Sequence, residues 1–269
     1  MCTLVIARRP GHAWPVIIAA NRDEMVTRPW LPPGSHWPDR PDVIAGKDEL
    51  AGGTWLGLNR HGVMAAALNG RRSLGPQTGF RSRGELPLEA LDHADAADAA
   101  DALSALNPAA YRTCHILIAD NRDAFMVSVR DDGGRRWVAK TAIPPGVSMI
   151  TSSGLNDTTH PRQRVYLPQF RLAAMPDPET GEWSAWRALL ASRLHDPGTQ
   201  PATAEWTPHE GAMTIVTDSG YGTVCSSLIA LPAPAARRKP PVFLFCAGRP
   251  GEAEFLPVQG QVDDRPPRA

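Results

Sequence analysis

Cys2, directly behind the initiator methionine, is the residue of this chain whose type and position could do chemistry. Once Met1 is removed, Cys2 carries a thiol and a free α-amine on the same carbon. A thiolate is a nucleophile, and an α-amine with an ordinary pKa of about 8 can take the proton of the thiol. One residue would then supply both nucleophile and base. The alternative is that Cys2 is only a small buried hydrophobe.

Two apolar stretches predict a hairpin that positions Cys2. Residues 3–7 and 15–20 are apolar and rich in β-branched side chains, and residues 8–12 between them are typical of a turn. The second strand leads into Asn21-Arg22-Asp23-Glu24, so the hairpin brings three charged side chains back beside Cys2. Charged groups at a buried strand end need partners, which favours a catalytic role for this end of the hairpin.

The remaining sequence predicts stacked antiparallel sheets covered by helices. We expect a loop rich in Pro and Trp at 25–42, strands at 51–59 and 63–69, a helix starting near 85, an Ala/Asp-rich helix at 92–106, a three-stranded meander between 113 and 140, a strand at 147–152, helices near 161–174 and 182–195 (with Leu194 on the apolar face of the second), and late strands at 212–217, 223–231 and 242–246. Residues 1–256 are predicted to form a single domain. The polar, proline-rich segment 257–269 is predicted to be a loose tail.

Composition excludes several classes of partner and site. Lys+Arg and Asp+Glu both number 28, so a net charge of zero argues against nonspecific binding of nucleic acid or anionic membranes as the main role. The four cysteines form no Cys-x-x-Cys pair, so no metal site is expected. Without disulfide spacing, a secretory leader or a long apolar span, we expect a soluble cytoplasmic protein with no stable membrane insertion.

Taken together, the motifs resemble the NRDE family, whose animal member is called the transport and Golgi organisation protein two. The resemblance covers residues 1–247. It rests on Met1-Cys2-Thr3-Leu4, Asn21-Arg22-Asp23-Glu24, Ala45-Gly46 with Gly52-Gly53-Thr54-Trp55-Leu56-Gly57, Gly62 through Asn69, Ser82-Arg83-Gly84 and Tyr221-Gly222-Thr223. This family is similar to the N-terminal-nucleophile hydrolases, especially the bile-salt hydrolases and penicillin acylases with an N-terminal cysteine. The resemblance implies an α+β fold, a four-layer αββα sandwich with two antiparallel sheets.

The resemblance also implies catalytic roles for three residues. Cys2 would attack an amide carbonyl, and Asp23 would hold the α-amine of Cys2 and tune its pKa. Asn69 would donate a hydrogen bond to the developing oxyanion, a contact worth about 3–4 kcal/mol in comparable sites. The alternatives are a turn or cap for Asp23 and a strand-end turn before Gly70 for Asn69.

Three positions depart from the pattern of the hydrolase branch. Ala20 stands where that branch has an arginine, and we expect the nearest cation, Arg22, to point to the other face of the strand. Ser153 stands where a second asparagine is expected, with Asn156 as a stand-in, and Val224 stands where the family usually has an arginine. Candidates for substrate binding are Arg22, Trp55, Arg83, Ser153 and Asn156, with Trp30 and Trp37 as further candidates for the pocket; the alternative for Arg83 is a surface ion pair.

The resemblance implies an amidohydrolase that cleaves a linear amide or N-acyl bond through an S-acyl intermediate on Cys2, without a cofactor. The alternative is a non-catalytic carrier of haem or lipid on the same fold, because animal members of the family are implicated in secretory organisation, lipid metabolism and haem mobilisation. The chain has eight histidines but no Cys-x-x-Cys-His site, and single residues such as His61 and His115 are more simply structural. An amidase requires removal of Met1 and a lowered thiol pKa, whereas a carrier requires neither.

Overall fold

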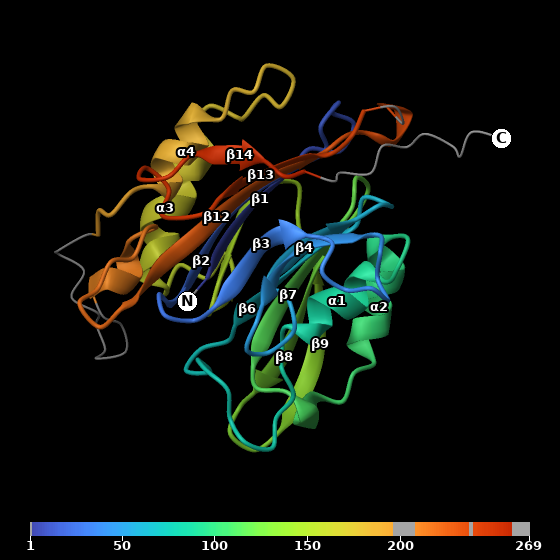
Figure 1. The fold of residues 1–269 in the computed structure, drawn as a ribbon, viewed down its shortest axis with the longest axis vertical. Helices are drawn as coiled ribbons and strands as arrows, with labels where there is room; N and C mark the ends of the chain where they lie inside the picture. Colours follow the sequence, from blue (N-terminus) through green and yellow to red (C-terminus); the bar gives the residue numbers. More distant parts are fainter. Residues whose placement is uncertain (1, 196–207, 237–238, 260–269) are drawn as a thin grey trace.

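The structure is a computed structural model that describes residues 2–195, 208–236 and 239–259. Its first sheet is antiparallel and seven-stranded, in the order β11-β10-β1-β2-β12-β13-β14. The strands are β1 (Thr3–Arg8), β2 (Val16–Met25), β10 (Gly146–Thr151), β11 (Gly154–Leu155), β12 (Tyr221–Leu231), β13 (Val242–Cys246) and β14 (Phe255–Pro257). The predicted first hairpin, β1–β2, therefore lies at the centre of this sheet, between strands that come from the second half of the chain (Figure 1).

The second sheet is a seven-stranded antiparallel meander in chain order from β3 to β9. Its strands are β3 (Trp30–Gly34), β4 (Val43–Asp48), β5 (Leu56–Asn59), β6 (Met64–Asn69), β7 (Cys114–Ala119), β8 (Ala124–Asp131) and β9 (Arg136–Ala142). The long connection between β6 and β7 contains two helices. It begins with a loop, residues 70–84, that follows directly after Asn69 at the end of β6.

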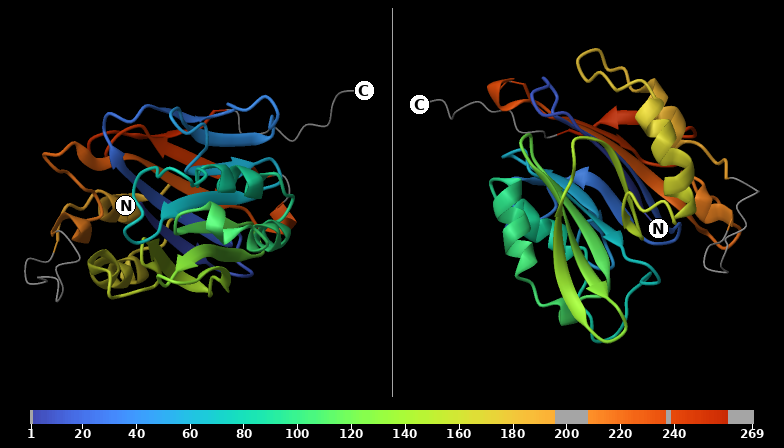
Figure 2. Two further views of the ribbon diagram at one scale, coloured as in Figure 1. Left: turned by 90° about the horizontal axis from the view of Figure 1, so that it is seen from below. Right: turned by 180° about the vertical axis from the view of Figure 1, so that it is seen from behind.

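Helices cover the outer face of each sheet (Figure 1, Figure 2). The helices α1 (Glu85–Leu91) and α2 (Ala96–Ser104) pack on the second sheet, and α3 (Pro161–Leu172) and α4 (Ser184–Leu190) pack on the first. Short 3-10 turns span Pro108–Ala110, Pro208–Gly211 and Pro234–Ala236. The layers run helix, sheet, sheet, helix, so the predicted αββα sandwich is confirmed.

Alternation along the strands separates the cores of the sandwich, because successive side chains of a strand point to opposite faces. In β1, Leu4 and Ile6 belong to the core between the two sheets, whereas Val5 belongs to the core beneath α3 and α4. The second sheet contributes residues such as Met64 to the core between the sheets. The side chain of Cys2, two residues before Leu4, thus faces the second sheet.

Two local predictions are wrong. Within the expected loop 25–42, Trp30–Gly34 forms the edge strand β3, where its prolines are tolerated because an edge strand leaves part of its backbone unpaired. The segment 212–217 is no sheet strand and forms only an isolated bridge between Val216 and Gly222. Its backbone instead bonds Thr223, which accepts from the Ile215 N–H through its hydroxyl oxygen at 2.9 Å.

The predicted end of the domain and the predicted end of the fourth helix also differ from the structure. The boundary predicted between residues 256 and 257 falls inside β14, and Val258 is buried in the core between the sheets. Residues 260–269 of the predicted tail lie outside the described residues. Leu194 lies beyond the end of α4 and is 78 % exposed, because the helix stops at Leu190 before the predicted apolar face is complete. Within the described ranges, no helix has the length and apolar content to cross a membrane.

Candidate active site

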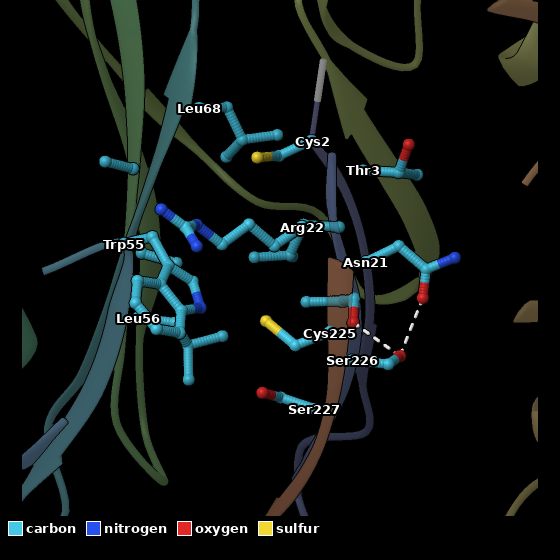
Figure 3. A pocket seen from close by; sticks show the side chains of 14 residues that line it. Cys2, Thr3, Asn21, Arg22, Trp55, Leu56, Leu68, Cys225, Ser226 and Ser227 are labelled. Atoms are coloured by element: carbon cyan, nitrogen blue, oxygen red, sulfur yellow. Dashed lines mark hydrogen bonds between the residues drawn. The ribbon is translucent and has the colours of Figure 1, made fainter. Parts of the chain in front are cut away.

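Strand register places Arg22 and Cys225 in neighbouring strands, with Cys2 directly before β1, and the three side chains lie on the face toward the second sheet (Figure 3). Thr3 pairs with Asn21 across β1 and β2, and Arg22 pairs with Cys225 across β2 and β12. Figure 3 shows the three side chains on the side of Trp55, whereas Thr3, Asn21 and Ser226 point the other way. Arg22 shares the face of Ala20, because residues two apart in a strand point the same way. The expectation that Arg22 would point to the opposite face is therefore wrong.

A β-bulge in β12 adjusts the strand beside this site. The register of β12 against β2 shifts between Thr223 and Cys225, which leaves Val224 as the extra residue. Because a bulge adds one residue, Thr223 and Cys225 no longer share a face. Thr223 reaches Asp23, and Cys225 projects between the sheets. The missing arginine at Val224 is thus accompanied by a distortion that redirects its neighbours.

Asp23 is the buried carboxylate of the motif. Its side chain is 0 % exposed; Thr223 donates to Oδ1 at 2.6 Å and Arg162 donates from Nη1 to Oδ2 at 3.1 Å. Arg162 also donates to the hydroxyl of Thr3, so the guanidinium of α3 joins β1 and β2 beneath the site. Arg162 is not predicted from the sequence, because no spacing indicates that this helix residue faces the hairpin rather than solvent.

The other residues of the motif Asn21-Arg22-Asp23-Glu24 have separate tasks. Asn21 donates to the carbonyls of Leu190 and Met213 at 3.0 and 2.9 Å, which fastens the end of α4 and the segment after it to β2. Glu24 lies at the rim, 3.7 Å from Arg28 in an ion pair. Asn21 therefore acts in the architecture, and only Arg22 and Asp23 lie against the thiol.

The surroundings of the Cys2 thiol shift its pKa upward, which favours the protonated form. Burial raises the pKa of the Cys2 thiol, and the Asp23 carboxylate raises this pKa further. Positive charge nearby, including Arg22, and the backbone N–H of Asp23 lower the pKa, but the net shift is upward. This is opposite to the lowered pKa that an amidase was expected to show. Attack by this thiol therefore requires a base that removes its proton as the reaction proceeds.

A cavity of about 370 Å³ opens in front of Cys2 and brings together most of the predicted site residues. The predicted residues that line it are Cys2, Arg22, Asp23, Trp55, Asn69 and Arg83. A narrower pocket of about 20 Å³, enough for about one water molecule, continues from Cys2 between the sheets to Cys225. The wider cavity is large enough for a small molecule.

Asn69 is the residue of this cavity best placed to polarise a carbonyl. It ends β6, where its backbone pairs with Cys114, and its side chain lines the cavity. No hydrogen bond joins its side-chain amide to any residue of the described ranges. An amide N–H that is already positioned and has no protein acceptor is available to donate to a ligand oxygen.

Trp55 and Arg22 form one wall of the site. The guanidinium carbon of Arg22 lies 4.2 Å from the centroid of the Trp55 ring, and its Nη2 donates to Asp48 at 3.1 Å. Gly46 leaves room for the indole, since a Cβ there would come within 2.3 Å of it. Trp30 packs edge-on against Trp55 at 5.9 Å between ring centroids. Neither Trp30 nor Trp37 lines the wider cavity, so of the three predicted tryptophans only Trp55 does.

Arg83 enters the cavity because two motifs approach each other closely. A Cβ on Gly53 would lie 2.4 Å from the backbone of Gly84, and the Thr54 N–H donates to the Gly84 carbonyl at 2.8 Å. This contact fixes the neighbouring Arg83 at the cavity. Burial lowers the pKa of its guanidinium. Arg83 makes no ion pair with a carboxylate of the described ranges, so the predicted alternative, a surface ion pair, is not what holds it.

Ser153 and Asn156 do not line either pocket. The Asn156 side chain accepts from the Met149 N–H at 2.9 Å and donates to the Ser148 hydroxyl at 3.1 Å, which ties β10 to the turn after β11. Ser153 has a buried hydroxyl oxygen with no hydrogen-bond partner within the part of the chain that the structure describes. Their assignment to substrate binding stays a prediction.

The histidines singled out as structural lie away from the cavity. His115 is buried in β7, with Nδ1 2.8 Å from the Ser128 hydroxyl and Nε2 3.1 Å from the Ser152 carbonyl, which joins the second sheet to the turn of the first. His61 is exposed in the turn between β5 and β6. Across the described ranges, no three His, Cys, Asp or Glu side chains gather in a metal-binding cluster.

Two facing antiparallel sheets between helix layers, with the first strand at the centre and its first residues at the cavity, define the fold of the N-terminal-nucleophile hydrolases. The chain itself belongs to the Transport and Golgi organisation 2 family, whose model matches residues 1–235. The human Transport and Golgi organization protein 2 homolog is 37% identical over 76 residues, which cover 27% of this chain and 26% of the human protein. The mouse homolog is 38% identical over 80 residues, 28% of each chain. These matches thus span about a quarter of the length of the curated relatives.

Solved structures share the fold at low sequence identity. A Caenorhabditis elegans ortholog of N-acylethanolamine-hydrolyzing acid amidase has a TM-score of 0.52 and 13% identity, covering 88% of this chain and 95% of its own. The C2A mutant of conjugated bile acid hydrolase from Clostridium perfringens has a TM-score of 0.51 and 13% identity, covering 97% of this chain and 94% of its own. At this identity the likeness establishes the architecture alone.

Proposed function

We propose that the protein is an amidohydrolase that cleaves a linear amide or N-acyl bond with Cys2 as an N-terminal nucleophile. The observation that carries the proposal is the shared cavity of Cys2 and Asn69, a thiol and a side-chain amide with no described partner. The two named structural neighbours, an amidase and a conjugated bile acid hydrolase, support the same reaction class. The proposal requires that Met1 is removed.

In the proposed reaction the α-amine of Cys2 accepts the thiol proton, and the sulfur forms a bond to the amide carbon. Asn69 donates to the resulting oxyanion. The amine, now an ammonium, returns the proton to the amide nitrogen, and the C–N bond breaks with release of an amine product. Water then attacks the S-acyl group with the α-amine as base, which releases the carboxylic acid and restores the thiol.

Asp23 would orient the α-amine during these steps. Its carboxylate is fixed by Arg162 and Thr223, and its backbone N–H contacts the Cys2 thiol. The raised pKa of Cys2 supports a role for the amine, because a protonated thiol gains nucleophilicity only when a base takes its proton. Arg22 supplies positive charge beside the sulfur when the thiolate forms.

Intact-protein mass spectrometry, before and after a brief low dose of iodoacetamide at neutral pH, tests the first requirement. The expected result is loss of one methionine and a single rapid alkylation that peptide mapping places on Cys2, because the freed α-amine can take the proton of this thiol whereas the other three thiols are buried. Hydrolysis of a panel of N-acyl amides should then be abolished by Cys2→Ala and preserved by Cys246→Ala. Retention of Met1, or hydrolysis that persists in Cys2→Ala, would sink the nucleophile assignment.

A non-catalytic carrier of haem or lipid is the competing proposal. No histidine belongs to the described lining of the wider cavity, so the thiol of Cys2 is the ligand that this lining offers to a haem iron. A haem titration followed by absorption spectroscopy separates the proposals. Stoichiometric binding that is lost in Cys2→Ala, in a protein without amide hydrolysis, would favour the carrier.

A further inference from the structure

The charges of the cavity are unevenly compensated. Arg22 and Arg28 both bind Asp48 at 3.1 and 2.6 Å, and Glu24 lies near Arg28. Asp23 is paired with Arg162. At the outer rim, Arg81 lies 2.7 Å from Glu85. These pairs account for every carboxylate of the described cavity lining and for three of its five arginines.

Arg83 and Arg112 are the two arginines that remain. Both donate to the carbonyl of Gly75, at 3.2 and 2.9 Å, so their guanidinium groups lie side by side. Arg83 also donates to the Ser73 hydroxyl at 2.8 Å, and Arg112 to the carbonyl of Arg72 at 3.2 Å. Their described acceptors are carbonyl and hydroxyl oxygens, and no described carboxylate pairs with either. Two adjacent cations at a cavity wall without a carboxylate create a site of positive potential.

Both guanidinium groups retain donors for a ligand. A guanidinium has five N–H groups, and the Nε–H of Arg83 and of Arg112 has no hydrogen-bond partner in the described part of the chain. A planar guanidinium matches the oxygens of a carboxylate, sulfonate or phosphate, and such charge-assisted bonds are stronger than bonds between neutral groups. Arg83 is near enough for its charge to interact with the Cys2 thiol, so an anion bound here would belong to a molecule that reaches the nucleophile.

We propose that Arg83 and Arg112 bind an anionic group of the substrate, and that the protein therefore acts on amides that carry a carboxylate, sulfonate or phosphate besides the bond to be cleaved. The assignment of a substrate class rests on the proposed function, whereas the anion site itself does not depend on it. The chemistry at this wall selects negative charge, whereas Leu50, Phe80 and Trp55 offer apolar contacts elsewhere in the cavity.

The first test compares the rates at which iodoacetate and iodoacetamide alkylate Cys2. The two reagents differ in charge, because iodoacetate carries a carboxylate where iodoacetamide carries a neutral amide. The ratio of the iodoacetate rate to the iodoacetamide rate should be higher for Cys2 in the protein than for a peptide with the sequence of residues 2–8. This ratio should fall roughly threefold to tenfold in Arg83→Gln and in Arg112→Gln at low salt, because each substitution removes one cation from the lining of the cavity that Cys2 shares. Arg83→Lys keeps the charge but loses the fork of hydrogen bonds, so it should preserve the ratio if loop geometry is intact.

Arg60→Gln is the matched control, because Arg60 lies at the far end of β5 and β6 and pairs with Asp42. Its ratio should equal that of the wild type. A wild-type ratio equal to that of the peptide, unchanged in both glutamine variants, would overturn the anion site. Division by the iodoacetamide rate removes any general loss of thiol reactivity, so a partly disturbed loop does not mimic the result.

A second test uses matched neutral and anionic N-acyl amides. Arg83→Gln and Arg112→Gln should raise KM for the anionic amides and leave KM for the neutral amide unchanged, and the carboxylate, sulfonate and phosphate members identify the preferred anion. Equal KM effects on neutral and anionic amides would overturn the substrate class. A raised alkylation ratio in a protein without any amide hydrolysis would refute the proposed function and the substrate assignment while the anion site stands.

Discussion

Arg162 and Asp23 form a buried ion pair that joins helix α3 to the strand behind the nucleophile. Nη1 of Arg162 lies 3.1 Å from Oδ2 of Asp23, and the two side chains are 1% and 0% exposed. The hydroxyl of Thr223 completes the contacts of the carboxylate at 2.6 Å. The orientation of Asp23 beside Cys2 thus depends on a helix that lies 139 residues further along the chain.

Arg162→Met should destabilise the protein by about 3–5 kcal/mol, because it removes the buried guanidinium that pairs with the buried carboxylate of Asp23. Urea denaturation followed by circular dichroism measures the change in the free energy of unfolding. Arg164→Met is the control, since Arg164 is exposed on the same helix and its replacement should change this free energy by less than about 0.5 kcal/mol. Equal effects of the two substitutions would contradict the assigned role of the ion pair.

Gly46→Ala should disturb the wall of the cavity. A Cβ at this position would lie 2.3 Å from the Trp55 ring, so the indole must move and its contact with Arg22 must change. We expect a loss of about 1–3 kcal/mol in the free energy of unfolding together with a shift in tryptophan fluorescence. Gly134→Ala has only a side-chain atom at 3.9 Å near its new Cβ and should leave both measurements unchanged.

Asn69→Ala should reduce the rate of acylation of Cys2 by about 10²–10³-fold, because it removes the proposed donor to the oxyanion. The burst of p-nitrophenol from an activated ester measures this step without knowledge of the natural substrate. Thermal unfolding should change little, since no described hydrogen bond depends on the Asn69 side chain. Asn107→Ala, at an exposed cap of a 3-10 turn, provides the control and should retain the full burst rate. An unchanged burst in Asn69→Ala would remove Asn69 from the mechanism.

His115 should make the protein less stable in acid. Burial lowers the pKa of His115 from 6.5 to about 4, so between these values the unfolded chain binds a proton that the folded chain does not. The contribution of His115 is therefore complete above pH 6.5 and is lost as the pH falls toward 4, by up to about 3 kcal/mol.

Urea denaturation of the wild type and of His115→Gln between pH 4 and 8 tests this dependence. The difference in the free energy of unfolding between them should be largest above pH 6.5 and should shrink as the pH falls. His61→Gln should show the same pH profile as the wild type, because His61 is exposed. A difference for His115→Gln that stays constant over this pH range would show that the buried ring does not titrate as inferred.

The sequence by itself determined the first hairpin, the two antiparallel sheets and the position of Cys2 at the start of this hairpin, beside residues 21–24. Apolar periodicity and turn residues are local signals, and the hairpin from Thr3 to Met25 is read directly from them. The close glycine contacts at Gly46 and Gly53 explain in physical terms why the motifs that carried the family resemblance need residues without side chains. The sequence predicts Cys2, Asp23, Asn69, Trp55 and Arg83 as site residues, and the structure gathers them at one cavity.

Only the tertiary structure decided which charges meet. Arg162 is one arginine among many in the sequence, and its burial against Asp23 follows from how α3 packs on the first sheet. The bulge at Val224 depends on the register between β12 and β2. Arg83 and Arg112 lie side by side because both donate hydrogen bonds to the carbonyl of Gly75. Charge compensation and burial are sums over neighbours far apart in the chain, so no local pattern of residue types can specify them.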